Sequence, residues 1–227
     1  MATARRERYR KQTREEAKAV ALTQLAEAGT AGISVNAIAK AMGMTGPALY
    51  RYFAGRDELL TELITDAYRD LAEATAAAVG EAAPVDRFRA LAHTIRDWAT
   101  AQPDRYLLIY GTPVPGYQAP PETTEIARAL MRTILDACAG LGGPAAGEPV
   151  SPLEAELARQ LDAVGPWTDG AEPDGAEPDG ELKGRALRTW TRLHGVISLD
   201  VQGQFSGMGF DPGTLFEAEV EALARGV

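Results

Sequence analysis

Cysteine and histidine are scarce in this chain of 227 residues, which contains one cysteine, Cys138, and two histidines, His93 and His194. A single cysteine excludes an intrachain disulfide framework and a cysteine-based zinc cluster. Two isolated histidines exclude an HExxH zinc site, and neither a GxSxG nucleophile motif nor a Walker phosphate loop occurs. We therefore predict no catalytic residues, no metal and no cofactor, and we interpret Cys138 as a small buried side chain.

Long hydrophobic runs are also missing. No stretch of about 18 apolar residues is present, as a membrane-spanning helix would require. The basic segment 1–8 is not followed by the apolar segment of a secretory signal. Apolar residues still make up 45 % of the chain, an ordinary share for a folded protein. We expect a cytoplasmic protein that does not associate with membranes.

The acidic net charge conceals a basic N-terminal segment. The formal net charge is −9, but residues 1–56 carry ten Lys and Arg against four Asp and Glu, a charge of +6. The remaining residues therefore carry −15. Such asymmetry is expected when one end of a protein binds a polyanion. The alternative is a flexible basic tail without a partner.

Residues 13–29 show the pattern of a first helix. Thr13 and Glu16 have the spacing of a capping box at its start, and Gly29 is typical of a helix end. A second helix is expected over residues 35–42.

Start and stop signals delimit the second helix and a third one. Ser34 is expected to cap the second helix and Gly43 to end it. The third helix is expected over residues 46–53, with Thr45 as its cap and Pro47 in its first turn. Two short helices joined by a turn that contains glycine predict a helix-turn-helix.

The third helix would be the one that enters the major groove of DNA. Leu49 and Phe53 are four residues apart and are expected to pack inward. Tyr50, Arg51 and Tyr52 would then lie on the outer face. Arg51 can donate two hydrogen bonds to a guanine, and tyrosine hydroxyls can bind phosphates. Structural packing is the alternative role for these side chains.

The segment from Ser34 to Leu60 resembles the DNA-binding domain of the TetR family of bacterial regulators. The resemblance rests on Ile38-Ala39, Gly43, Leu49-Tyr50, Tyr52-Phe53, Leu59 and a basic residue, Arg56, where the family usually has lysine. Together with the features above, it implies a DNA-binding surface of Ser34, Asn36, Thr45, Gly46, Pro47, Ala48, Tyr50, Arg51, Tyr52 and Arg56. We expect Arg56 to clamp a phosphate. The arm from Arg5 to Arg14 would enter a minor groove or, alternatively, remain a solvated tail.

Residues from 57 onward show helical apolar periodicity and no alternation of strands with helices. The expected helices cover residues 57–79, 85–101, 104–110, 122–139, 151–164, 181–205 and 212–225. Residues 170–180 repeat Gly-Ala-Glu-Pro-Asp twice and are expected to form a flexible acidic loop. The chain is thus predicted to be all-α, with a helix-turn-helix domain (1–56) joined by a long helix to a ligand-binding and dimerisation domain (57–227).

Two interaction sites are predicted in this second domain. The last two helices carry wide apolar faces, which either form a four-helix bundle with a second copy or complete the core of one chain. The candidate dimer residues are Trp190, His194, Ile197, Val201, Phe216 and Val220. The segment from Trp190 to Gly195 resembles the Trp-His-Gly signature of one TetR subfamily, and we interpret His194 as a packing residue. The family resemblance also implies a cavity for an apolar or aromatic effector, with Trp98, Tyr106, Tyr110 and Tyr117 as candidates.

The function predicted from these features is transcriptional regulation. We expect a homodimeric repressor that a small-molecule effector releases from a palindromic double-stranded operator. The alternatives are a regulator without an effector, and an all-α ligand-sequestering protein or enzyme with a vestigial DNA-binding domain.

Overall fold

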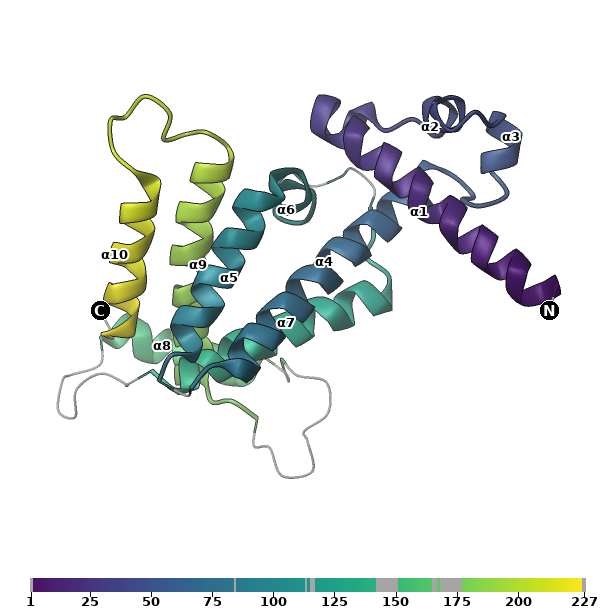
Figure 1. The fold of residues 1–227 in the computed structure, drawn as a ribbon. Coiled ribbons are helices and arrows are strands. Elements are labelled where there is room, and N and C mark those ends of the chain that lie inside the picture. Colours follow the sequence, from purple (N-terminus) through teal and green to yellow (C-terminus); the bar gives the residue numbers. More distant parts are fainter. Residues whose placement is uncertain are drawn as a thin grey trace. The chain divides into compact units, whose positions relative to one another are not determined.

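The computed structural model describes residues 2–83, 85–112, 114, 117–141, 151–164, 167 and 177–225. Every regular element in these residues is a helix (Figure 1), which confirms the all-α prediction. Most of the acidic repeat at 170–180 lies outside the described residues. None of the described helices combines the length and apolar character needed to cross a bilayer.

The chain divides into two compact units. The head unit, as we name it, consists of Met1–Ala67 and Pro103–Thr123, and the body unit consists of Tyr68–Gln102 and Thr124–Val227. The head unit is therefore larger than the predicted segment 1–56. It contains α1 (Ala2–Ala28), η1 (Thr30–Gly32), α2 (Val35–Ala41), α3 (Gly46–Leu49), α6 (Pro103–Tyr110) and the first turns of α4 (Arg56–Glu81).

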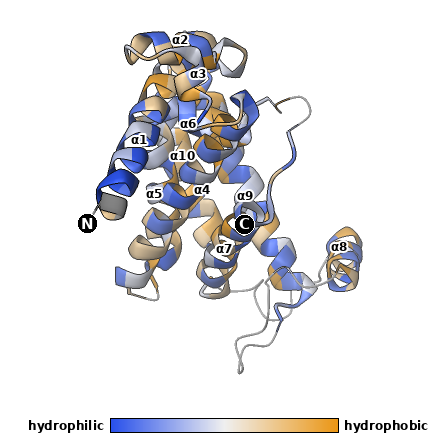
Figure 2. Ribbon diagram, turned by 90° about the vertical axis from the view of Figure 1, so that its right-hand side faces the viewer, coloured by the Kyte–Doolittle hydropathy of each residue, from blue (hydrophilic) through white to orange (hydrophobic). Residues whose placement is uncertain are grey.

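Helix α1 begins eleven residues before the position predicted for it. Thr13 is not a cap, because its hydroxyl lies within the helix and donates to the Tyr9 carbonyl at 3.0 Å. The predicted capping box is therefore wrong, and residues 5–14, which were interpreted as an arm or a solvated tail, belong to α1. The residues before Thr13 include no glycine or proline and are rich in Arg, Lys and Glu, which favour helix. Figure 2 shows that hydrophilic residues dominate this end of α1.

The helix-turn-helix itself follows the predicted signals closely. The Ser34 hydroxyl accepts a hydrogen bond from the Ala37 amide at 3.3 Å and caps α2. Gly43 has φ of +67°, the left-handed conformation that ends α2. Thr45 occupies the N-cap position of α3, but its hydroxyl makes no capping bond. Helix α3 is shorter than predicted, because residues 50–52 form a turn.

The core of the head unit forms where α1, α2 and α3 meet. Leu49 and Phe53 are fully buried, as their spacing predicted. Ala17 and Ala21 of α1 and Ile38 of α2 have no solvent exposure either. Small side chains on α1 allow the other helices to approach it closely, which gives the short α3 a fixed base.

The body unit contains the second part of α4 together with α5 (Arg87–Ala101), most of α7 (Pro121–Ala139), α8 (Pro152–Ala163), α9 (Gly180–Val201) and α10 (Pro212–Ala224). Its core includes Phe88 and Ile95 of α5, Leu193 of α9 and Phe216 of α10. The predicted helix bounds agree to within a few residues, except that α9 ends at Val201 and a turn follows over residues 202–207. Ser151 and Glu154 form a capping box at the start of α8.

Candidate nucleic-acid interface

The predicted DNA-contacting residues all reach the surface of the head unit. Exposed positions are Ser34, Asn36, Thr45, Pro47, Tyr50 and Arg51, and half-buried positions are Gly46, Ala48, Tyr52 and Arg56. Tyr50 is 46 % exposed although it is a large aromatic residue. The buried side chains Leu49 and Phe53 anchor this segment from beneath. The segment therefore presents polar and aromatic groups outward from a rigid base.

The start of α3 lies directly against α2. A Cβ atom at Gly46 would lie 2.6 Å from the Asn36 side-chain oxygen. Since that distance is shorter than any ordinary contact, Gly46 allows Asn36 to occupy this position. The two candidate residues are thereby brought together, one at each side of the turn.

Arg56 does not extend freely toward solvent. Its Nη2 atom donates to the Thr30 carbonyl at 2.5 Å, and its Nη1 atom is 3.9 Å from Asp57. The side chain thus ties the start of α4 to η1, a structural role that the sequence analysis missed. Its remaining N–H groups are the donors that a phosphate contact would use.

A set of ion pairs, which we call the α1–α4 clasp, joins two helices of the head unit. Arg14 contacts Glu58 at 3.1 Å and also pairs with Glu62, and Lys18 pairs with Asp66 at 2.6 Å. The two bases are four residues apart, as are the three acids, so that each set follows one helix face. Burial opposes the charged form of Lys18, but the bonds of Lys18 to Asp66 and to Glu15 outweigh this effect and raise its pKa.

Arg14 also holds the turn after α3. Its guanidinium donates to the Tyr52 carbonyl and lies over the Phe53 ring, 4.4 Å from the ring centroid. Glu58 accepts a hydrogen bond from the Ala54 amide, and this bond, with the nearby Arg14, lowers the pKa of Glu58. The clasp therefore positions the segment that follows the recognition helix.

Comparison with known proteins identifies the family. Residues 19–63 match bacterial regulatory proteins of the tetR family, and residues 88–223 match the tetracyclin repressor-like C-terminal domain. The chain belongs to the tetR family. The two matched domains include residues of both the head unit and the body unit, and the TetR resemblance of the sequence is confirmed. The narrower Trp-His-Gly resemblance stays a prediction.

Relatives of known class agree with this assignment. The HTH-type transcriptional regulators Rv1816 of Mycobacterium tuberculosis and Mb1846 of Mycobacterium bovis are each 37 % identical to this TetR-family chain over 221 residues, covering 92 % of it and 90 % of their own length. The crystal structure of the regulatory protein SCO4313 is 50 % identical, with a TM-score of 0.80 and coverage of 96 % and 97 %. The fold is shared by FadR of Bacillus subtilis in complex with stearoyl-CoA, at 16 % identity, a TM-score of 0.57 and coverage of 94 % and 98 %. The protein is a TetR-family helix-turn-helix transcriptional regulator.

The predicted dimer residues fall into two groups. Ile197, Phe216 and Val220 are almost completely buried within the single chain, so they form its core and do not offer a surface to a second copy. Trp190, His194 and Val201 are half-exposed on α9. The rings of Trp190 and His194 stack with centroids 5.1 Å apart, and burial lowers the pKa of His194. The apolar stripe was interpreted too broadly, because helical spacing alone does not separate a core face from its edges.

The predicted effector-binding aromatics are distributed over both units. Trp98 belongs to the body unit, where it is buried and its Nε1 donates to Asp70 at 3.0 Å. Tyr106, Tyr110 and Tyr117 belong to the head unit. Tyr106 is fully buried, burial raises its pKa, and its ring centroid lies 5.2 Å from that of Tyr110.

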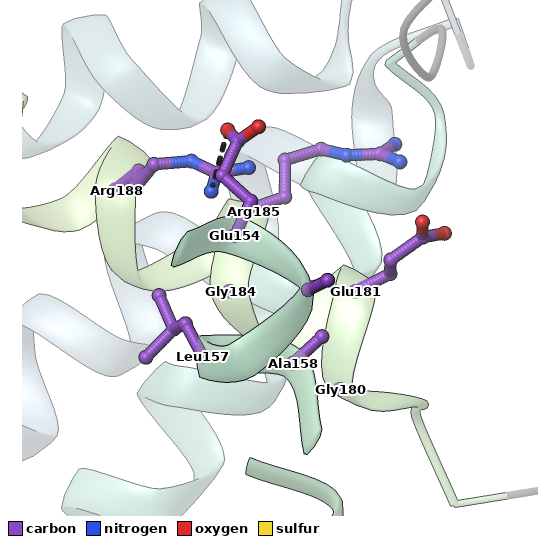
Figure 3. Close-up of a pocket in the computed structure, with 9 residues that line it drawn as sticks. Glu154, Leu157, Ala158, Gly180, Glu181, Gly184, Arg185 and Arg188 are labelled. Carbon is purple, nitrogen blue, oxygen red and sulfur yellow. Dashed lines mark ion pairs between the residues drawn. The ribbon is translucent and has the colours of Figure 1, made fainter. Parts of the chain in front are cut away.

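The body unit also has a groove that the sequence analysis missed. Figure 3 shows its lining residues on α8 and α9 and the ion pair of Arg188 with Glu154. The groove has a volume of about 200 Å³, and the ion pair is 3.1 Å long. Leu157, Gly184 and Arg185 are among its other lining residues, and none of the four predicted aromatics lines it. Among the described residues, no cluster of three or more His, Cys, Asp and Glu side chains can hold a metal ion.

Proposed function

We propose that the protein is a homodimeric repressor, acting in the cytoplasm without catalytic activity, that a small apolar or aromatic effector releases from a palindromic operator. The observation that supports operator binding most directly is the outward face of the helix-turn-helix. It presents Ser34, Asn36, Thr45, Pro47, Tyr50 and Arg51 to solvent while Leu49 and Phe53 hold it in place. Gly46 and Ala48 would let the backbone approach the bases, and Tyr52 and Arg56 would contact phosphates.

The outer face of α9 supports dimerisation. A Cβ atom at Gly195 would meet nothing within 4 Å, so packing inside the chain does not require a glycine there. Glycine within a helix costs about 1 kcal/mol relative to alanine. A second α9 packed closely against this position, beside Trp190 and His194, would explain the residue. Two recognition helices in such a dimer would read half-sites about 34 Å apart.

Effector release would depend on the predicted effector residues, of which Trp98 belongs to the body unit and the three tyrosines belong to the head unit. Stearoyl-CoA binds to FadR, a protein of the same fold, and this favours an effector with an apolar part. The candidate contacts remain Trp98, Tyr106, Tyr110 and Tyr117. Helix α4 contributes residues to both units, so we propose that it carries the effector signal to the helix-turn-helix. By linkage, operator and effector must weaken each other's binding by the same factor.

The test begins with selection of bound fragments from genomic DNA. We expect one palindromic site, bound by two chains, and we expect a compound related to the neighbouring genes to weaken binding. Light scattering gives the number of chains, and fluorescence anisotropy gives the affinity with and without the compound. Retention of no genomic fragment would contradict operator binding, and equal effector affinity with and without operator would contradict the release mechanism.

A matched pair of variants tests the dimer. Gly195→Ala should stabilise α9 itself while weakening the dimer at least tenfold, because the added methyl group separates the two helices. Gly80→Ala in α4 is the control, since a Cβ there also meets nothing within 4 Å. Sedimentation equilibrium measures the dimer affinity of both. Unchanged dimerisation of Gly195→Ala would exclude this face.

A further inference from the structure

A basic groove of about 260 Å³ opens in the head unit between the N-terminal turns of α1 and the turn after α3. It is lined by Arg6, Tyr9, Arg10, Arg51 and Tyr52. Three guanidinium groups and two phenol rings therefore surround it, and no carboxylate lines it. Tyr9 is 65 % exposed, so its ring does not belong to the core of the unit.

Two of the three arginines that line this groove have no ion-pair partner among the described residues. Arg6 and Arg51 form no ion pair with any residue that the structure describes. Arg10 contributes to the electrostatic field that lowers the pKa of Glu58. One turn further along α1, Arg14 is fully engaged by Glu58 and Glu62. On α1, Arg14 is therefore paired with carboxylates of α4, whereas Arg6, nearer the N-terminus, can bind a ligand.

We propose that the basic groove binds one backbone phosphate of the operator, and that Arg51 contacts this phosphate and does not read a guanine. This proposal rests on the proposed function and deepens it, because it assigns Arg6, Tyr9 and Arg10 to the DNA interface. Guanidinium groups bind phosphate through paired N–H donors, and phenol hydroxyls donate one further hydrogen bond.

The position of Arg51 supports this assignment. The N-terminal residues of a recognition helix are those that reach base edges. Helix α3 ends at Leu49, so Arg51 lies beyond its C-terminal end, where it lines the same groove as Arg6 and Arg10.

The helical state of residues 2–12 points the same way. A helix with its side chains is about 10–12 Å wide, whereas the minor groove of B-DNA is about 6 Å wide. The N-terminal segment therefore cannot insert into the minor groove as an extended arm would. Its arginines can still reach phosphates that lie along the edge of the groove.

The test compares two single and two double variants of the full-length protein on its selected operator. Arg51→Gln and Arg6→Gln each remove one groove donor. The double variant Arg8→Gln/Lys11→Gln is the control, because both residues are exposed on the same helix and neither lines the groove. Thermal unfolding should be unchanged in all four variants, since every substituted side chain is exposed.

We measure affinity by anisotropy over a range of salt concentrations and on operators with each base pair replaced in turn. Arg51→Gln should bind about tenfold more weakly on every sequence, with the slope of log K against log salt reduced by about 1. Arg6→Gln should weaken binding in the same way. The double variant Arg6→Gln/Arg51→Gln should lose less binding free energy than the two single variants together, because both arginines contact one phosphate. The control variant Arg8→Gln/Lys11→Gln should lose less operator affinity than either single variant.

Two results would overturn the proposal. Arg51→Gln that relaxes the preference at a single base pair would show a base contact. Groove variants that match the control would show a diffuse charge effect without a site. In both cases the wild-type protein still binds its operator and the proposed function stands, whereas wild-type protein that binds no fragment would overturn both proposals.

Discussion

Both units of this protein contain paired and unpaired arginines, but the units differ in how these arginines are placed. In the body unit, Arg96 pairs with Asp200, Arg188 with Glu154 and Arg192 with Glu219. In the head unit, Arg14 is paired in the same way, but Arg6 and Arg51 are not. The comparison shows that the number of basic residues does not mark a DNA-binding surface. Lack of an ion pair does not mark it either, because Arg89 and Arg132 of the body unit form none with a described residue. We propose that the gathering of Arg6, Arg10 and Arg51 around one groove marks it.

The largest effects should come from the two cores. Phe53→Ala in the head unit and Phe216→Ala in the body unit should each lower the free energy of unfolding by about 4 kcal/mol, because both rings are fully buried. We expect Phe53→Ala to abolish operator binding and preserve the dimer, and Phe216→Ala to weaken the dimer. Chemical denaturation, anisotropy and light scattering measure the three quantities. Loss of both operator binding and dimerisation in each variant would show that the units do not act separately.

Substitution of two glycines at helix starts by alanine should affect different properties, namely stability at Gly180 and operator binding at Gly46. A Cβ at Gly180 would lie 2.0 Å from the backbone oxygen of Ala158, whereas the atom nearest a Cβ at Gly46 belongs to the Asn36 side chain. Because backbone cannot yield cheaply, Gly180→Ala should destabilise the body unit by about 2 kcal/mol. Gly46→Ala should change thermal stability little but weaken operator binding by displacing Asn36.

These glycine variants are measured by calorimetry and anisotropy. Gly184→Ala is a suitable control, since a Cβ there makes ordinary contacts of 3.7 Å or more. A Gly46→Ala protein with native operator affinity would show that the position of Asn36 does not matter for DNA binding.

Ion pairs should contribute more in the head unit than in the body unit. Arg14→Met removes pairs with two carboxylates, a bond to the Tyr52 carbonyl and a contact with Phe53, and should cost about 1.5 kcal/mol. Arg188→Met removes a half-exposed pair with Glu154 and should cost about 0.5 kcal/mol. Urea unfolding at two salt concentrations tests this order. Equal costs would mean that the α1–α4 clasp is an ordinary surface network.

The smallest expected effect is a difference in acid sensitivity. Burial lowers the pKa of His194 below 6.5, so the unfolded chain binds more protons and stability falls as the pH drops from about 6.5. In the head unit, the lowered pKa of Glu58 makes stability fall only below about 4.5. His194→Gln should therefore remove part of the loss between pH 6.5 and 5 in thermal melts. Glu58→Gln should leave that interval unchanged.

Much of the DNA-binding region could be predicted because its signals are local. Ser34, Gly43 and the pair Leu49 and Phe53 act on neighbours within one or two helical turns, and the structure places each as expected. The start of α1 was predicted wrongly for a related reason. A capping-box spacing is also compatible with the interior of a helix, and here favourable helix formers before Thr13 extend α1.

The remaining parts of the site depended on distant residues. Arg56 bonds to Thr30, and the dimer stripe of α9 separated into a buried set and a half-exposed set only once α5 and α10 were in place. Sequence spacing could have suggested the clasp, since Arg14 and Lys18 match the spacing of Glu58, Glu62 and Asp66. It could not show that Arg6, Arg10 and Arg51 line one groove.

The sequence by itself determined most of the helices and the helix-turn-helix, because helical periodicity, caps and left-handed glycines act over a few residues. The family was indicated by the resemblance of its motifs. Only the tertiary structure decided which charges remain available for DNA. Arg14 and its partner Glu58 are 44 positions apart, whereas Arg6 and Arg10, on the same helix, carry the same charge and remain at the surface. Charge is a property of each residue, but neutralisation by a partner is a property of the fold, because it needs two side chains within about 4 Å.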